Sequence, residues 1–235
     1  MSNNRPLSPR FSIALVLSIW CLTPPVWADF ETGMDAWQRD NYATALSEWR
    51  PLAEKGDAQA QLHVGLLYAN GNGVPQDYAK ARQWYEKAAA QGYSMAQSHL
   101  GLLYANGNGV PQDYTKAHQW FEKAAAQGYA SGQNNLGNLY ADGKGVPKDE
   151  IKGAEWIRKA AEQRDANGQT SLGEMYREGR GVPQDYIQAL MWHNLGAANG
   201  AKRRAALRDA LAKQMTPDQI AEAHKLAQEW KPKGR

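Results

Sequence analysis

The chain has 235 residues, 27 basic and 24 acidic side chains, and a formal net charge of +3 at neutral pH. Nucleic-acid binding depends on neutralising many phosphates, so this near balance gives it no support. Cys21 is the single cysteine, so the rest of the chain has no disulfide, thiolate nucleophile or cysteine metal ligand.

Residues 1–28 have the pattern of a cleaved secretory signal. Arg5 and Arg10 give a positive start, an apolar run follows at 11–22, and the segment ends in small residues at Ala28. The apolar run is too short to span a bilayer, and no later apolar stretch approaches the length of a membrane span. We therefore expect a periplasmic or secreted protein with no integral membrane span.

Cleavage after this segment is expected to leave a chain that begins at Asp29. Its 25 basic and 24 acidic residues give a net charge of +1. The competing interpretation is a lipoprotein anchored through Cys21. Trp20 disfavours it, because such sites need a small residue before the cysteine.

An octapeptide recurs along the chain at intervals of 36 residues. It reads GNGVPQDY at 71–78 and again at 107–114, GKGVPKDE at 143–150 and GRGVPQDY at 179–186. A glycine row and a tryptophan row keep the same interval. They are Gly65, Gly101, Gly137 and Gly173, and Trp84, Trp120, Trp156 and Trp192. A fixed period of this length indicates a solenoid of stacked repeats.

Each repeat predicts two helices, at 58–70 and 77–91 in the first copy, joined by the octapeptide. Gly71 suits the left-handed end of the first helix, and Asp77 can cap the second. Gly65 costs about 1 kcal/mol relative to alanine in a helix, so we expect another helix to cross it closely. A phosphate-binding loop is the alternative, but no strand precedes the octapeptide and the Gly-Lys-Ser/Thr ending is missing.

The repeated pattern AQ..LG..Y..G.GV..D..KA..WY.KAA.QG resembles the Sel-one-like repeat, a relative of the tetratricopeptide repeat. This resemblance implies an all-α fold, a right-handed α-solenoid of helical hairpins. It places a leading half repeat at about 29–57 and capping helices with a basic tail at 201–235. The four full repeats are expected at about 58–93, 94–129, 130–165 and 166–200.

Three residues depart from the repeat pattern. Pro51 lies inside the leading second helix and should kink it. Glu150 replaces the tyrosine of the octapeptide, and Gly153 replaces an alanine, so we expect the third hairpin to be the loosest joint. In the C-terminal segment, Thr216 with Gln219 predicts a capped helix.

Histidine is the strongest candidate for catalysis or metal binding, but the five histidines form no suitable cluster. Two share a repeat register and should lie roughly 8–10 Å apart, too far for one metal ion. No GxSxG or SxxK motif is present. We therefore predict no catalytic residue, metal or cofactor, and we interpret the histidines as solvated or partly packed. They are His63, His99, His118, His193 and His224.

Two further features invite a functional interpretation. The tryptophan row coincides with the alanine face of the second helices, so we interpret it as core and not as a sugar platform. A basic cluster in the tail could touch anionic lipid, polysaccharide or an acidic partner, but a solvated cap surface is the simpler reading. The cluster consists of Lys202, Arg203, Arg204, Arg208 and Lys213.

The family resemblance favours a non-enzymatic scaffold or adaptor that binds another protein. In tetratricopeptide-like hairpins the first helices line the concave face, which places three rows of this chain in a groove. The first row is Leu62, Ser98, Asn134 and Thr170; the second is Leu66, Leu102, Asn138 and Glu174; the third is Asn70, Asn106, Asp142 and Glu178.

These rows change from apolar in the first two hairpins to polar and acidic in the last two. We expect an unidentified partner protein to place apolar side chains over Leu62, Leu66 and Leu102 and a donor-rich or basic part near Asp142 and Glu174. The alternative is that the leucines pack inward. The competing function is an envelope-glycan binder, or a regulator of enzymes that process cell-wall glycans or exopolysaccharide.

Overall fold

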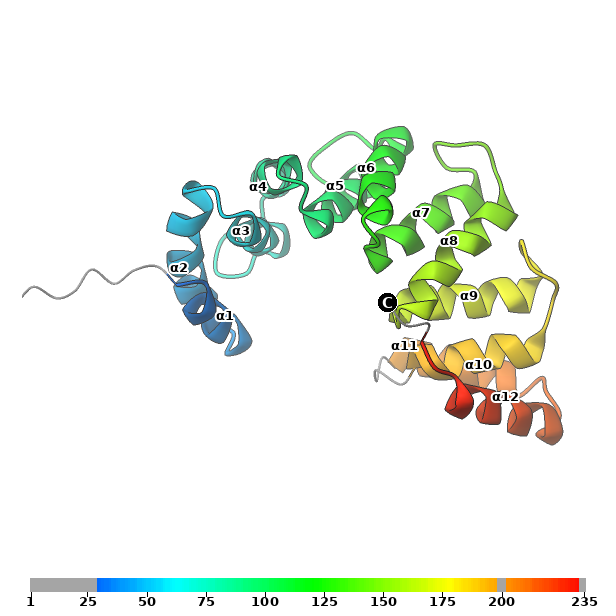
Figure 1. Cartoon of the computed structure of the whole chain (residues 1–235). Helices are drawn as coiled ribbons and strands as arrows, with labels where there is room; N and C mark the ends of the chain where they lie inside the picture. Colours follow the sequence, from blue (N-terminus) through cyan, green and yellow to red (C-terminus); the bar gives the residue numbers. More distant parts are fainter. Residues whose placement is uncertain (1–28, 198–201, 233–235) are drawn as a thin grey trace, which may run out of the picture.

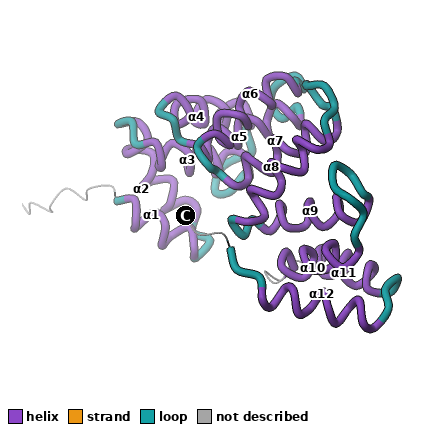
Figure 2. Tube along the Cα trace, turned by 45° about the vertical axis from the view of Figure 1, so that its right-hand side comes forward, coloured by secondary structure: helices purple, strands orange, loops and turns teal. Residues whose placement is uncertain are grey.

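In the computed structural model, residues 29–197 and 202–232 are described, with side chains from 205 onward in the second range, and they form twelve helices. Successive helices follow a curved path from α1 to α12 (Figure 1), and loops join them throughout the described part (Figure 2). None of these helices is long and apolar enough to cross a membrane. Their bounds are α1 Phe30–Gln38, α2 Tyr42–Glu54, α3 Ala58–Asn70, α4 Tyr78–Ala90, α5 Ser94–Asn106, α6 Tyr114–Ala126, α7 Ala130–Asp142, α8 Glu150–Glu162, α9 Ala166–Glu178, α10 Tyr186–Ala197, α11 Lys202–Ala212 and α12 Pro217–Glu229.

The helices pack as consecutive hairpins, α3 with α4, α5 with α6, α7 with α8 and α9 with α10. The second helix of each hairpin packs on the first helix of the next. The first helices α5, α7 and α9 also contact one another in sequence, which puts them on the inner, concave side of the curve. Both α11 and α12 pack on α10 and cover the C-terminal end of the array.

The octapeptide forms the corner between the two helices of each hairpin, as predicted. Gly71 has φ of +71° and its N–H donates to the carbonyl oxygen of Leu67. The Asp77 carboxylate accepts a 2.9 Å hydrogen bond from the backbone N–H of Lys80 and begins α4. The predicted capping box at Thr216 is also present. The phosphate-loop alternative is not needed, because helix termination and capping account for the repeated residues.

The glycine row marks close helix crossings, which confirms the prediction for Gly65. A Cβ atom added to the glycines at 65, 101 and 137 would lie 2.4–2.6 Å from a side chain of the following helix, and at 173 it would lie 3.1 Å away. The side chain that fills the space differs in each repeat. The facing residues are Tyr85, Phe121, Ile157 and His193.

The third hairpin is not the loosest joint, and that prediction is wrong. α7 and α8 are the most extensively packed pair of helices. A Cβ on Gly153 would lie 2.8 Å from the carbonyl oxygen of Gly137, so the two glycines let the backbones approach. Glu150 adds ion pairs with Lys148 at 2.8 Å and with Arg180 at 3.4 Å.

Candidate functional site

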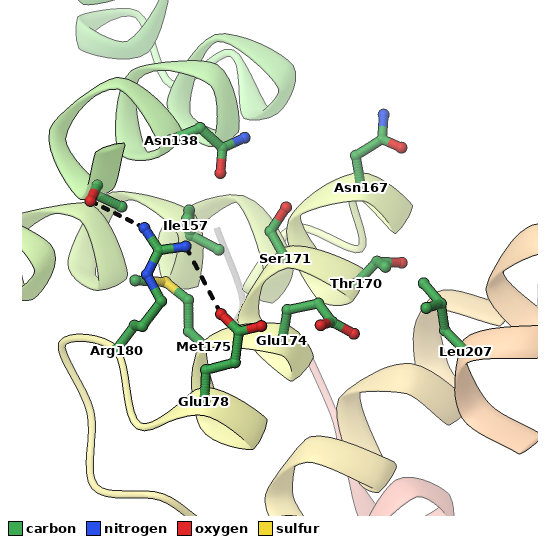
Figure 3. A pocket seen from close by; sticks show the side chains of 11 residues that line it. Asn138, Ile157, Asn167, Thr170, Ser171, Glu174, Met175, Glu178, Arg180 and Leu207 are labelled. Carbon is green, nitrogen blue, oxygen red and sulfur yellow. Dashed lines mark hydrogen bonds and ion pairs between the residues drawn. The ribbon is translucent and has the colours of Figure 1, made fainter. Parts of the chain in front are cut away.

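A cavity of about 590 Å³ opens on the concave side between α7, α9 and α11. We call it the trough. Polar side chains of α9, including Thr170, Ser171 and Glu174, form its floor, while Asn138 of α7 and Leu207 of α11 border it from different sides (Figure 3). Because α11 follows α9 by the repeat interval, the trough spans three successive first-helix positions.

The wall of the trough is apolar behind this polar floor. Ala141 and Ile157 contribute from the third hairpin, Met175 from α9 and Leu207 from the capping helix. A smaller cavity of about 200 Å³ adjoins it between the second and third hairpins, and Asn138 lines both. Together the two cavities extend from the second hairpin to the capping helix α11.

The first of the three predicted groove rows does not face a groove. Leu62, Ser98 and Asn134 are only 0%, 3% and 5% exposed, so the prediction that they are open to a partner is wrong. Leu62 packs in a core cluster with Ala81 of α4 and Leu100 of α5. The next hairpin covers this side of each first helix, as the inward-packing alternative proposed. Thr170 alone of this row lines the trough.

The other two predicted rows lie at the concave surface. The second row is half-buried and consists of Leu66, Leu102, Asn138 and Glu174, and the third is exposed and consists of Asn70, Asn106, Asp142 and Glu178. Their C-terminal members meet in the cavities. Asn138, Glu174 and Glu178 line the trough, and Leu102, Asn106 and Asp142 line the smaller cavity.

Glu174 is the most strongly perturbed acid of the trough. Its Oε1 lies 3.1 Å from Nε2 of His193, and its Oε2 accepts hydrogen bonds of 2.9 and 2.7 Å from the Arg177 guanidinium. The contacts with His193 and Arg177 outweigh burial and lower the pKa of the Glu174 carboxyl to about 2. The trough therefore keeps this negative charge at any ordinary pH.

His193 is buried, with 1% of its surface exposed, so its interpretation as an isolated, solvated or partly packed residue is wrong. It stands where the other repeats place Tyr85, Phe121 and Ile157. A sequence signal for the pair exists, because an acid at 174 stands with a histidine at 193 in the fourth repeat, whereas the third repeat holds Asn138 with Ile157. In the first two repeats the same two positions hold Leu66 with Tyr85 and Leu102 with Phe121.

Arg180 ties the fourth corner to the third hairpin at the edge of the trough. Its Nη2 donates 2.9 Å hydrogen bonds to Oδ1 of Asp142 and to the carbonyl oxygen of Ala141. Nε donates a longer bond, 3.4 Å, to Glu150. In register with it stand Asn72, Asn108 and Lys144, so this clamp belongs to the last repeat.

Three of the remaining histidines contact aromatic side chains, and His224 is exposed. His63 lies 4.7 Å from the Trp49 ring, and His99 stacks on Tyr85 with centroids 5.1 Å apart. Burial lowers the pKa of His99 to about 4. His118 contacts the Tyr140 hydroxyl at 3.1 Å. Within the described ranges no three histidine, cysteine or acidic side chains gather as metal ligands.

The tryptophan row is only partly core. Trp192 is buried, whereas the other three members are half-buried and pack against the margins of the core clusters. A lysine ammonium lies over each half-buried ring at 4.0, 4.3 and 3.9 Å. These rings are Trp84, Trp120 and Trp156.

Two sequence features lie wholly or partly outside the described residues. The segment 1–28, which we predict to be a secretory signal, is one, and the side chains at 202–204 of the basic cluster are the other. Of that cluster, Arg208 pairs with Asp209 at 2.7 Å and Lys213 is exposed.

Comparison with known proteins identifies the repeat. The family model described as Sel1 repeat matches residues 58–93, 94–129, 130–165 and 166–200. A Sel1 repeat protein from Oxalobacter formigenes is similar in structure, with a TM-score of 0.64, 28% identity, and coverage of 84% of this chain and 85% of that chain. No match was found among the curated proteins.

Two further solved structures are similar. A protective antigen of uropathogenic Escherichia coli is 33% identical with a TM-score of 0.52, over 80% of this chain and 48% of that chain. An immunity protein from Pseudomonas aeruginosa is 23% identical with a TM-score of 0.54, over 83% of this chain and 81% of that chain. At that identity the last similarity shows the fold alone.

Proposed function

Because the chain belongs to the Sel1 repeat family, which its four matched repeats show, we propose that it is a non-enzymatic scaffold that binds a segment of another protein in the trough. The observation that carries this proposal is the cavity of about 590 Å³ across α7, α9 and α11. Stacked helical repeats present a continuous concave surface of this kind to their partners.

The chemistry of the trough suits a polypeptide segment. Ile157, Met175 and Leu207 offer apolar contacts, while Asn138 and Ser171 offer donors and acceptors at the surface. A cavity that combines apolar walls with a few polar groups is typical of binding sites. A peptide has both kinds of group, apolar side chains and a hydrogen-bonding backbone.

We propose that this binding takes place in the periplasm or outside the cell. The support is the sequence of residues 1–28, with its positive start, short apolar run and small residues at the end. Sequencing the N-terminus of the exported chain tests this, and an intact leader or a lipid on Cys21 would contradict it.

Site-specific photo-crosslinking in the native envelope tests the binding function. A photoreactive residue at Ser171, in the trough, is compared with one at Gln119, which is exposed on α6. We expect position 171 to crosslink one discrete protein and position 119 to give no such product. Crosslinks from 119 alone contradict the proposal, and a glycan product at 171 replaces it with the glycan-binding function.

A further inference from the structure

We propose that Asn72 and Asn108 are sites of spontaneous, non-enzymatic deamidation at the first two corners of the solenoid. The products are aspartate and isoaspartate, and in isoaspartate the main chain runs through the former side-chain carbonyl. The substrate is the chain itself, and water is the only co-reactant. This inference does not depend on the proposed binding function.

Five asparagine–glycine pairs lie in the described part of the chain. Glycine after asparagine favours deamidation, because a residue without a side chain lets its backbone nitrogen approach the carboxamide closely. The sequence by itself therefore predicts the same chemistry at every pair. The pairs begin at Asn70, Asn72, Asn106, Asn108 and Asn167.

Deamidation needs a free backbone nitrogen on the glycine. The nitrogen of Gly73 loses its proton to base and attacks Cγ of Asn72, which forms a five-membered cyclic imide and releases the Nδ2 nitrogen as ammonia. Water then opens the imide at one of its two carbonyls, which gives aspartate or isoaspartate. No oxidant or reductant is required. A glycine N–H that donates a hydrogen bond must first be released, so the hydrogen bond slows the reaction.

Three of the five glycine N–H groups donate a hydrogen bond, and the asparagine before each of them lies inside a helix. The Gly71 N–H donates to the carbonyl oxygen of Leu67 at the end of α3. The Gly168 N–H donates to Oδ1 of Asp165 at 2.7 Å at the start of α9. Helical hydrogen bonding therefore protects these pairs. They are Asn70–Gly71, Asn106–Gly107 and Asn167–Gly168.

The other two pairs lie in the loop of a corner. Among the described residues, no group accepts a hydrogen bond from the N–H of Gly73 or Gly109, and both glycines are exposed to solvent. Base and water can therefore reach the reacting nitrogen. At the same register the third and fourth corners hold Lys144 and Arg180, which have no carboxamide to react. The chemistry is thus confined to the first two corners.

Isoaspartate at either corner disturbs a close backbone contact. It lengthens the main chain by one methylene group, directly before a glycine that packs against the preceding second helix. A Cβ added to Gly73 would lie 2.8 Å from Cβ of Tyr42 in α2. One added to Gly109 would lie 2.6 Å from Cβ of Tyr78 in α4. The longer chain forces each corner away from that helix, so deamidation should loosen the N-terminal hairpins and spare the trough.

Ageing of the purified chain in mildly alkaline buffer, followed by peptide mapping with mass spectrometry, tests the proposal. We expect Asn72 and Asn108 to convert about tenfold faster than the three protected pairs, because those must open first. An isoaspartyl methyltransferase should label the same two positions. The chain unfolded in urea is the control. There all five pairs should convert at similar rates, since their hydrogen bonds are lost.

Asn72→Lys combined with Asn108→Lys is the matched variant, because it takes the residue that the third corner has at Lys144. Ageing should lower the Tm of the wild type by at least about 2–4 °C, as overpacking does in a chain of this size, and should leave the Tm of the variant unchanged. An equal fall in both proteins overturns the loosening of the corners by isoaspartate.

Two results of the peptide mapping overturn the assignment of the reactive pairs. Equal conversion at Asn70 and Asn72 in the folded chain shows that the hydrogen bond of the glycine N–H does not control the reaction. Conversion at Asn72 and Asn108 only in urea shows that the folded corner protects them.

Discussion

Gly153 lies where helices α7 and α8 cross. For its replacement by alanine, the repeat pattern and the tertiary structure predict opposite changes in stability. The other repeats carry alanine at this register, at positions 45, 81, 117 and 189. Helix propensity alone favours the change by about 1 kcal/mol. The pattern by itself therefore predicts that Gly153→Ala raises stability.

The structure predicts the opposite sign. An added Cβ would lie 2.8 Å from the carbonyl oxygen of Gly137, 2.8 Å from Cβ of Ala141 and 2.9 Å from its backbone nitrogen. These atoms cannot rotate away, so α8 must move outward along the crossing. Overpacking of this kind costs about 1–3 kcal/mol. After the propensity gain we expect a net loss of about 1 kcal/mol, which lowers Tm by about 2–4 °C in a chain of this size.

Thermal melting followed by far-ultraviolet circular dichroism measures this change. Ala117→Gly is the matched control, because Ala117 is fully buried at the same register of α6. It should also lower Tm, since it loses helix propensity and leaves a cavity. Both directions of exchange then destabilise, as expected when each residue fits its own crossing. A higher Tm for Gly153→Ala would refute the reasoning.

Three further outcomes are expected. Arg180→Ala combined with Asp142→Ala in a double-mutant cycle of unfolding should show a coupling of about 0.2–1 kcal/mol, because both partners are about one-third exposed. The wild type should lose stability more steeply than Glu174→Gln as the pH falls from about 4.5 to about 2. The pKa of the Glu174 carboxyl is lowered to about 2 in the folded state, so the stability that it contributes is present above the unfolded-state pKa and is lost as the pH falls to the folded-state pKa. Equal slopes in the two proteins contradict this. A proton NMR titration should place the pKa of His99 at about 4, and stability should fall as the pH drops from 6.5 toward 4, because the unfolded chain binds the proton more readily; a midpoint near 6.5 contradicts the burial argument.

Much of the fold was predictable from the sequence because its signals are local. Helix termination at Gly71, capping by Asp77 and the capping box at Thr216 depend on residues within one turn. The 36-residue interval then fixes the number of hairpins, since identical units stack in the same way. The all-helical repeat fold followed from these local helix signals and from the repeat interval.

Helix rotation and pair contacts were not predictable in this way. The repeat register predicted that Leu62 and Glu174 both face the groove. The structure shows that the next hairpin covers Leu62, whereas Glu174 lines the trough. The same limit applied to Gly153. The missing methyl group predicted a loose joint, but in the structure it lets the backbones of α7 and α8 cross closely.

The sequence by itself determined the repeat, its helices, its corners and the drift of the inner rows toward polar residues. The position of the trough on the concave face could be learned only from the tertiary structure. The sequence of α11 lacks the repeat motif, so it does not predict that α11 continues the row of first helices. The tertiary structure also joined His193 to Glu174 across 3.1 Å, a contact between two helices that neither residue encodes locally. Local hydrogen bonds fix elements, whereas the packing of neighbouring hairpins fixes which side chains remain free to bind.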